Sequence, residues 1–288
     1  MENLTHSLVG AVVADAALGQ GASRRTRRVF LAVGIIASNA PDIDLLYTSI
    51  TPMPVGYLLH HRGHTHTLVG LLALFGMLTP IMIAVRSLSQ RDPPPLMRLC
   101  VVLGLGLGSH LALDAGNNYG VHPFFPIDNR WYYGDTIFIF EPWLWLMLGA
   151  VLMANATTAI GRALLGAGLV VLPISTVMVG LVPWESLAIL AALTSLLAWA
   201  LRKRSPAARA VFALIFCALF SAGMFLVSRL ARAEARAELA LPLPARVLDI
   251  VMTPSPGFPI CWAAIVVQRD DQAGTLILRR GSLSLVPG

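Results

Sequence analysis

Long apolar runs alternate with short, arginine-bearing connections along most of the chain. A helix needs about 20 mostly apolar residues to cross a bilayer. Six runs reach or approach that length, at residues 67–86, 98–113, 137–154, 163–182, 187–201 and 210–228. Two shorter apolar stretches, Leu8–Leu18 and Val29–Ala40, flank an arginine-rich turn. At about 1.5 Å per residue each covers less than about 20 Å, so we expect them to be tilted, re-entrant or buried among other helices.

The pattern changes towards the C-terminus. A charged stretch at 232–238 predicts a further piece of helix, and prolines follow at Pro242, Pro244, Pro254, Pro256 and Pro259. Residues 263–278 then indicate two β-branched strands joined by a polar turn. We therefore predict an all-α polytopic membrane protein with about six to eight apolar helical segments, some short or re-entrant, and a small β-containing tail. The expected regions are a His/Asp-rich part (1–136), an apolar helical bundle (137–228) and an extramembrane tail (229–288).

Composition supports a membrane protein. Only 12% of the residues are charged, against roughly 25% in soluble domains. The net charge of +6 comes almost wholly from arginine, because Lys203 is the only lysine. These arginines lie in short connections and are not interleaved with aromatic residues. The positive charge therefore indicates how the helices are oriented in the membrane and where the protein contacts anionic lipid. We expect no nucleic-acid partner.

The arginine distribution also predicts an orientation. The connections at 24–28, 86–98, 155–162 and 202–209 carry the positive charge and are expected to be cytoplasmic. The regions 41–66, 114–136 and 183–186 then face outward. Seven polar residues fall on that outer side: His6, Asp42, Asp44, His61, His66, His110 and Asp114.

Five of the seven histidines lie in two clusters, one at residues 60–66 and the other at His110. His110 and Asp114 share a helix face, where they can bind a metal ion or simply hydrogen-bond to each other. In the first cluster, Gly63 breaks a regular helix, so several rings can converge on one point. A polar cap before the next helix is the alternative reading of that cluster.

Asp42 and Asp44 stand close together, and such carboxylates repel each other unless a cation or proton separates them. They are candidate metal ligands or a general base, or Asp42 caps a helix. Further along, the loop at 114–135 is rich in hydrogen-bonding groups. Possible substrate-cleft residues are His64, Asn118, His122 and Asp135. Glu141 either supports the site or lies at the membrane interface.

Several other chemistries lack a motif. The cysteines are scattered and form no C-x-x-C pair, so neither a thiolate metal site nor a disulfide framework is indicated. There is no G-x-S-x-G, S-x-x-K or P-loop pattern. A serine nucleophile or a nucleotide-driven machine therefore has no support from the sequence.

The motifs Thr5-His6, Pro41-Asp42-Ile43-Asp44, His61-Arg62-Gly63-x-Thr65-His66 and His110-x-x-x-Asp114 occur in that order. So arranged, they resemble the YdjM-type family of membrane-bound, metal-dependent hydrolases, whose bacterial members include LexA-regulated inner-membrane proteins. Asn118-Tyr119-Gly120, Asp135 through Phe138 and Glu141-Pro142 resemble the longer branch of that family, although that branch usually has aspartate where Glu141 stands. The resemblance covers residues 1 to about 150.

The resemblance implies a location in the bacterial inner membrane and a metal centre. Its residues would be His6, Asp42, Asp44, His61, His66, His110 and Asp114, whereas His64 falls at a variable position. Nitrogen and oxygen ligands suit Zn²⁺, with Mn²⁺ or Fe²⁺ also compatible.

The expected function is hydrolysis, by a metal-activated water, of a lipid-borne ester or phosphodiester at the outer leaflet. Asp42 or Asp44 would act as general base or bind a second ion, and Arg62 would stabilise a phosphate or oxyanion. One alternative is a metal-ion or proton-coupled transporter, which the few polar residues between 163 and 228 disfavour. The other is a non-catalytic protein whose helices are stapled together by a metal ion.

Overall fold

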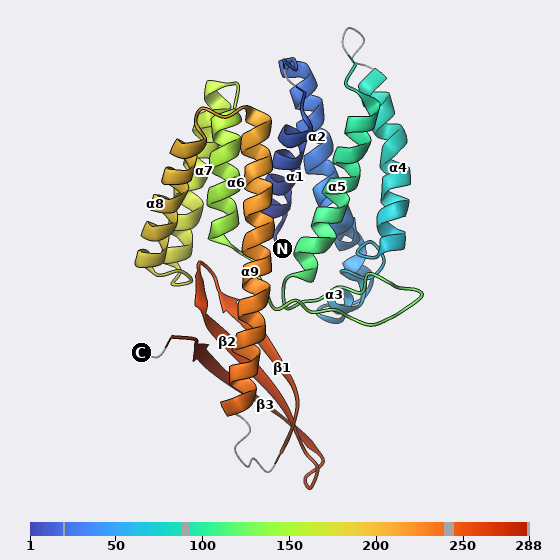
Figure 1. Cartoon of the computed structure of the whole chain (residues 1–288). Helices are drawn as coiled ribbons and strands as arrows, with labels where there is room; N and C mark the ends of the chain where they lie inside the picture. The colour runs from blue at the N-terminus through green and yellow to red at the C-terminus, as the bar shows by residue number, and fades with distance from the viewer. Residues whose placement is uncertain (20, 88–92, 239–244, 287–288) are drawn as a thin grey trace.

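The computed structural model describes residues 1–19, 21–87, 93–238 and 245–286. Over these residues the chain is a bundle of helices that run up and down, with a three-stranded sheet beyond one end (Figure 1). The helices are α1 (Asn3–Ala17), α2 (Arg24–Asn39), the 3-10 helix η1 (Ala40–Ile50), α3 (Val55–His60), α4 (Leu68–Ser87), α5 (Leu96–Ala115), α6 (Pro142–Asn155), α7 (Ala159–Met178), α8 (Trp184–Leu201) and α9 (Pro206–Glu238). The strands are β1 (Arg246–Ser255), β2 (Phe258–Asp270) and β3 (Thr275–Ser284).

The predicted fold class is confirmed. The six long apolar runs correspond to α4 through α9. Within the described residues, six helical segments are long and apolar enough to cross a membrane, counting α2 and η1 together, and α6 is a shorter apolar helix. The last helix also includes the charged stretch that ends at Glu238. Pro242, Pro244 and part of the 86–98 connection lie outside the described residues.

The two short apolar stretches became a packed pair of helices. α1 and α2 are antiparallel neighbours, and α1 is also covered by α5, α6 and α9. The pair approaches closely at Gly10 and Gly34, where a Cβ on Gly10 would lie 2.2 Å from the Gly34 carbonyl oxygen. With 15 residues, α1 is shorter than the hydrocarbon core of about 30 Å. Burial among longer helices resolves that mismatch, because few lipids meet α1.

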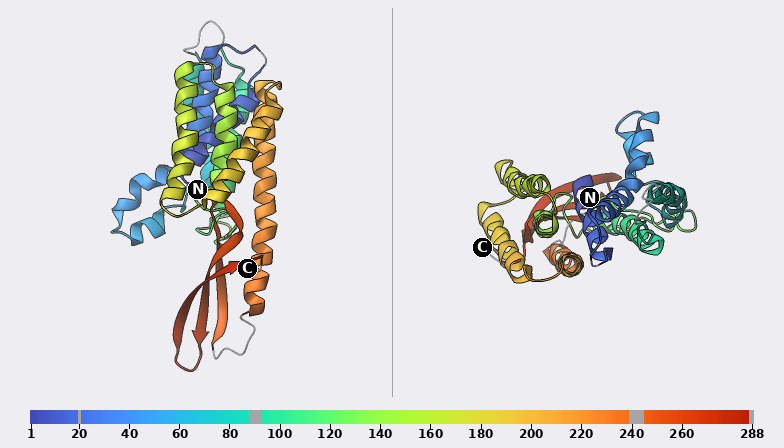
Figure 2. Two further views of the ribbon diagram at one scale, coloured as in Figure 1. Left: turned by 90° about the vertical axis from the view of Figure 1, so that its left-hand side faces the viewer. Right: turned by 90° about the horizontal axis from the view of Figure 1, so that it is seen from above.

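One hydrophobic core runs through the bundle. Most of its buried members come from α1, α2, α5, α6 and α9, among them Val12, Phe30, Leu103, Leu148 and Ala213, and α4 adds Leu71 and Met82. α7 and α8 stand at one side of the bundle (Figure 2) and expose large apolar side chains, as expected of lipid-facing spans. The His/Asp-rich part and the apolar bundle thus share a single core.

The C-terminal sheet is antiparallel in the order β1-β2-β3 and packs against the projecting half of α9 (Figure 1). Trp262 and Met252 from the sheet meet Ala231 and Ala235 of the helix. The predicted hairpin corresponds to β2 and β3, whereas β1 was not predicted. The prolines argued against a strand in this part of the sequence. Pro254 nevertheless lies within β1, at a point where the register with β2 becomes irregular.

Candidate metal centre

Four segments bring the polar residues together: α1, η1, the loop after α3 and the last two turns of α5. Gly63 and Arg62 turn the loop, with Arg62 at a φ of 63°. The result is a cluster of histidine and aspartate at the end of α2 farthest from the arginine-rich turn. All seven ligand candidates from the sequence lie in or directly beside this cluster: His6, Asp42, Asp44, His61, His66, His110 and Asp114.

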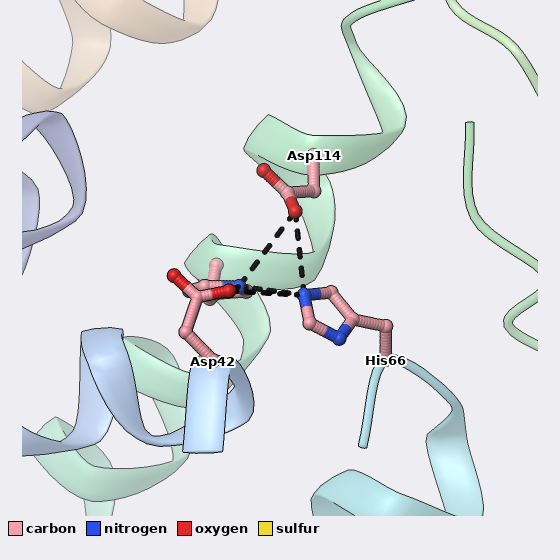
Figure 3. Close-up of side chains that lie close together, drawn as sticks. Asp42, His66 and Asp114 are labelled. Atoms are coloured by element: carbon pink, nitrogen blue, oxygen red, sulfur yellow. Dashed lines mark hydrogen bonds and ion pairs between the residues drawn. The ribbon is translucent and has the colours of Figure 1, made fainter. Parts of the chain in front are cut away.

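Asp42, His66, His110 and Asp114, here called the His/Asp tetrad, point at a common centre. Figure 3 shows Asp42, His66 and Asp114 turned toward one another. The ligand atoms are separated by 3.0 Å (His66 Nε2 to His110 Nε2), 3.3 Å (His66 to Asp114), 3.4 Å (His110 to Asp42), 3.5 Å (His66 to Asp42) and 3.8 Å (His110 to Asp114). A tetrahedron with ligands 2.0–2.1 Å from a zinc ion has edges of roughly 3.3 Å. The tetrad therefore matches the dimensions of a four-coordinate site.

In both tetrad histidines, the Nδ1 atom points away from the centre of the tetrad and toward an oxygen atom. Nδ1 of His110 lies 2.7 Å from the carbonyl oxygen of Ser38, and Nδ1 of His66 lies 3.2 Å from Oδ2 of Asp44. With a proton on each Nδ1, both Nε2 atoms face the centre of the tetrad, where a metal ion or a shared proton can join them. Metal-bound histidines in proteins are oriented in the same way by an acceptor behind the ring.

Burial and charge favour a cation at this point. Burial alone would lower the pKa of His66, but hydrogen bonds with Asp114, Asp42 and Asp44 outweigh it and raise this pKa to about 10. A proton on His66 thus offsets part of the charge of the three carboxylates when no metal ion is bound. A divalent ion would replace that proton at the same place.

Asp44 and His61 form the adjoining part of the cluster. With Asp42 they make a second group whose ligand atoms all lie within 4.8 Å of one another. However, Asp44 is fully buried and its oxygens already face four partners of the chain: His61 Nδ1, the Arg62 backbone N–H, the Thr65 hydroxyl and His66 Nδ1. Asp44 is therefore placed to hold the loop and the His66 ring.

His6 lies behind the tetrad. Its ring stacks on His110 with centroids 3.8 Å apart, and its Nε2 is 3.4 Å from Oδ1 of Asp114. The side chain is fully buried, and neither ring nitrogen has a hydrogen-bond partner. Unpaired buried nitrogens are costly, so this position also fits a bound ion or an ordered water beside the tetrad.

The Arg62 guanidinium is buried beside the tetrad. Its NH2 group lies 3.0 Å from Oδ2 of Asp114, and its NH1 group donates to Asn117 Oδ1 at 3.0 Å and to the Gly120 carbonyl at 3.2 Å. Arg62 therefore fixes both Asp114 and the turn that follows α5. Asn117 contributes to this arrangement through its side-chain oxygen.

The four possible cleft residues lie away from the tetrad. His64 is exposed and stacks on Phe125. His122 Nε2 lies 2.5 Å from the Gly63 carbonyl oxygen, to which it donates, and its Nδ1 lies 3.2 Å from Asn129 Oδ1. Asn118 donates to Thr253 Oγ1 of β1 at 2.7 Å. Asp135 pairs with Arg232 of α9 and accepts from the Met252 N–H. Glu141, at the start of α6, accepts from the Gly257 N–H. Asn118, Asp135 and Glu141 thus connect the segment between α5 and α6 to α9 and the C-terminal sheet.

Two contacts to the tetrad had no sequence signal. The amino group of Met1 pairs with Asp114 Oδ1. Asn3 Nδ2 donates to Asp42 Oδ2 at 3.0 Å from the first turn of α1. Asp42 is the most accessible member of the tetrad, with 9% of its side chain exposed against 0–1% for the others. Asp42 is therefore the member of the tetrad nearest to solvent.

The fold and the cluster define a multi-helix membrane protein with a His/Asp group able to hold a metal ion. The chain matches the family described as YdjM inner membrane protein over residues 1–185, and it belongs to that family. This match includes every member of the tetrad and ends within the first turn of α8. No curated protein and no solved structure matches the chain.

Proposed function

We propose that this protein is a membrane-bound, metal-dependent hydrolase with a single zinc ion held by the His/Asp tetrad. The supporting observation is the spacing of the four ligand atoms, which corresponds to tetrahedral coordination. The set contains nitrogen and carboxylate oxygen without sulfur, which also suits Mn²⁺ or Fe²⁺. A divalent ion at such a site supplies Lewis acidity, which polarises an ester or phosphoryl oxygen and lowers the pKa of water.

The surrounding residues take distinct roles. Asp42, the most accessible member of the tetrad, is the carboxylate that we assign to accept a proton from water. Asp44 orients the His66 ring through Nδ1. Arg62 holds Asp114 and the adjoining turn, so we assign it to positioning; the sequence expectation that it contacts a phosphate or oxyanion stays a prediction.

A lipid-borne ester or phosphodiester is the proposed substrate class. The tetrad lies at the end of α5, a span 20 residues long, where lipid head groups are found. The arginines at 24–28, 86, 98, 162 and 202–209 lie at the other end of the bundle, whereas those of the projecting half of α9 lie on the tetrad side. By the positive-inside rule the tetrad then faces the outer, periplasmic leaflet.

A second candidate is a structural metal site that staples α5, η1 and the loop after α3. It is favoured by a specific observation: four protein ligands are present and three of them are fully buried. Structural zinc sites are closed in this way, whereas catalytic sites keep one position open. An open position is thus the property that separates the two candidates.

Metal content tests the site. Elemental mass spectrometry of detergent-purified protein should find one equivalent of metal in the wild type and none in His66→Ala or Asp114→Ala. His64→Ala is the matched control, because this exposed histidine lies only two positions from His66 and should leave the metal in place. Unchanged metal in both tetrad variants would reject the site.

Catalysis is tested separately on cobalt-substituted protein. Inorganic phosphate should change the visible spectrum of Co²⁺ if a coordination position is open, and lipid esters and phosphodiesters should then be screened for cleavage. A spectrum that does not respond to phosphate, together with no cleavage, would favour the structural candidate.

A further inference from the structure

The chain leaves the bundle after α2. The segment of residues 40–60, here called the η1–α3 segment, projects sideways from the helices (Figure 2). Its inner face carries the buried Asp44 and the tetrad member Asp42. Its outer face is apolar: Leu46 and Ile50 are 79% and 77% exposed, and Ile43, Met53 and Val55 are exposed as well.

This exposed surface is unusual for a face in contact with water. Residues 45–59 contain no charged side chain. Apolar area costs roughly 25 cal/mol per Å² in water, and soluble proteins rarely expose large contiguous apolar patches. The two tyrosines, Tyr47 and Tyr57, are half-buried, and amphipathic rings of this kind concentrate at the boundary between lipid and water.

The position of the segment identifies what covers it. α2 has 16 residues and rises about 24 Å, so the chain arrives near the head groups when the segment begins. The segment also contacts α4, a membrane span that exposes Val69 and Leu72 in its first turns. The apolar outer face of the segment thus continues the lipid-facing surface of α4.

We propose that the η1–α3 segment is an interfacial anchor that inserts its apolar face into the leaflet beside the tetrad. Its partner is the acyl region of membrane lipid. Amphipathic elements bind in this way, with the apolar face a few ångströms below the head groups. The anchor would hold the accessible side of Asp42 at head-group depth. Only this last consequence rests on the proposed hydrolase function; the insertion itself does not.

Spin labelling tests the depth. Single-cysteine variants Leu46→Cys and Ile50→Cys would be made with Cys100, Cys217 and Cys261 replaced by alanine, and studied in nanodiscs of phosphatidylethanolamine and phosphatidylglycerol. Leu72→Cys on α4 is the lipid-exposed reference, and Gln272→Cys in the β2–β3 turn is the aqueous one. The ratio of oxygen to nickel-complex accessibility should exceed one at 46, 50 and 72 and fall below one at 272.

Two results would overturn the proposal. Nickel accessibility at 46 and 50 equal to that at 272 would place the segment in water. Low accessibility to both reagents with dipolar broadening would show that a second copy of the chain covers it. If the cysteine-free background does not fold, hydroxyl-radical footprinting of the native protein decides. Met53 should be protected in nanodiscs while Tyr133 of the outer loop is labelled, and labelling of both would reject insertion.

Discussion

The Nε2 atoms of His66 and His110 face each other across 3.0 Å. Behind each ring an oxygen occupies the Nδ1 side, from Asp44 for His66 and from Ser38 for His110. Each histidine is therefore fixed in orientation before any ion arrives. Because the two rings are already oriented, metal binding loses less side-chain conformational entropy.

Asp44→Asn should weaken metal binding without removing the ligands. The amide lacks the negative charge behind His66, and loss of such an acceptor costs 10–100-fold in metal affinity as an order of magnitude. Competition titration against a chelating dye measures the effect. Asp128→Asn changes a partly exposed carboxylate that pairs with Arg130; it is the control and should match the wild type. Equal affinities in both variants would show that Asp44 does not orient the ring.

Gly10→Ala should destabilise the α1–α2 pair. The new methyl group would meet the Gly34 carbonyl and the Ser38 hydroxyl, and overpacking of this kind costs about 1–3 kcal/mol. Thermal unfolding in detergent should show a lower Tm. In contrast, Gly76→Ala on α4 meets nothing within 4 Å and should be neutral or slightly stabilising, because alanine favours helix. A Tm unchanged by Gly10→Ala would contradict the close contact.

Arg62→Lys should loosen the turn after α5. A lysine ammonium cannot reach Asp114, Asn117 and Gly120 with the planar fork of the guanidinium. We expect faster hydrogen exchange at residues 116–120 than in wild type. The exposed Arg130→Lys should leave these amides unaffected. If exchange in the turn does not change, the guanidinium does not hold it.

Glu141 gives the protein a pH dependence. Burial raises the pKa of this carboxyl to about 8, although the hydrogen bond from the Gly257 N–H opposes the shift. The folded state thus holds the proton more tightly than the unfolded state, where the ordinary value is 4.5. The associated stability is complete below the unfolded pKa and is lost as pH rises through the folded one. We expect the Tm to fall between about pH 4.5 and about pH 8 and to level off above that range.

Glu141→Gln removes this titration and should give a flatter Tm profile over the same range. Glu185→Gln, at an exposed carboxylate in the first turn of α8, should retain the wild-type slope. Parallel profiles for wild type and Glu141→Gln would assign the pH dependence to other groups.

The spans and the ligand candidates could be predicted because their signals are local. A run of apolar residues is visible within 20 positions, and His110 and Asp114 share a helix face by their spacing alone. The contact of Asn118 with Thr253 joins residues 135 positions apart, and no local pattern encodes it. Likewise, Asp42 and Asp44 look equivalent in sequence. Only the fold shows that Asp44 is enclosed by donors while Asp42 stays accessible.

The contacts that join the segment between α5 and α6 to α9 and the sheet have a mechanical consequence. Asn118, Asp135 and Glu141 bind α9 or the sheet, and Asn118 is four residues from Asp114. α9 is one helix of 33 residues without an internal proline, so it has no built-in hinge. The sheet lies beyond the residues that match the family. A displacement of the sheet would therefore move α9 as a rigid body and would be passed through these three contacts to the end of α5 that carries the tetrad.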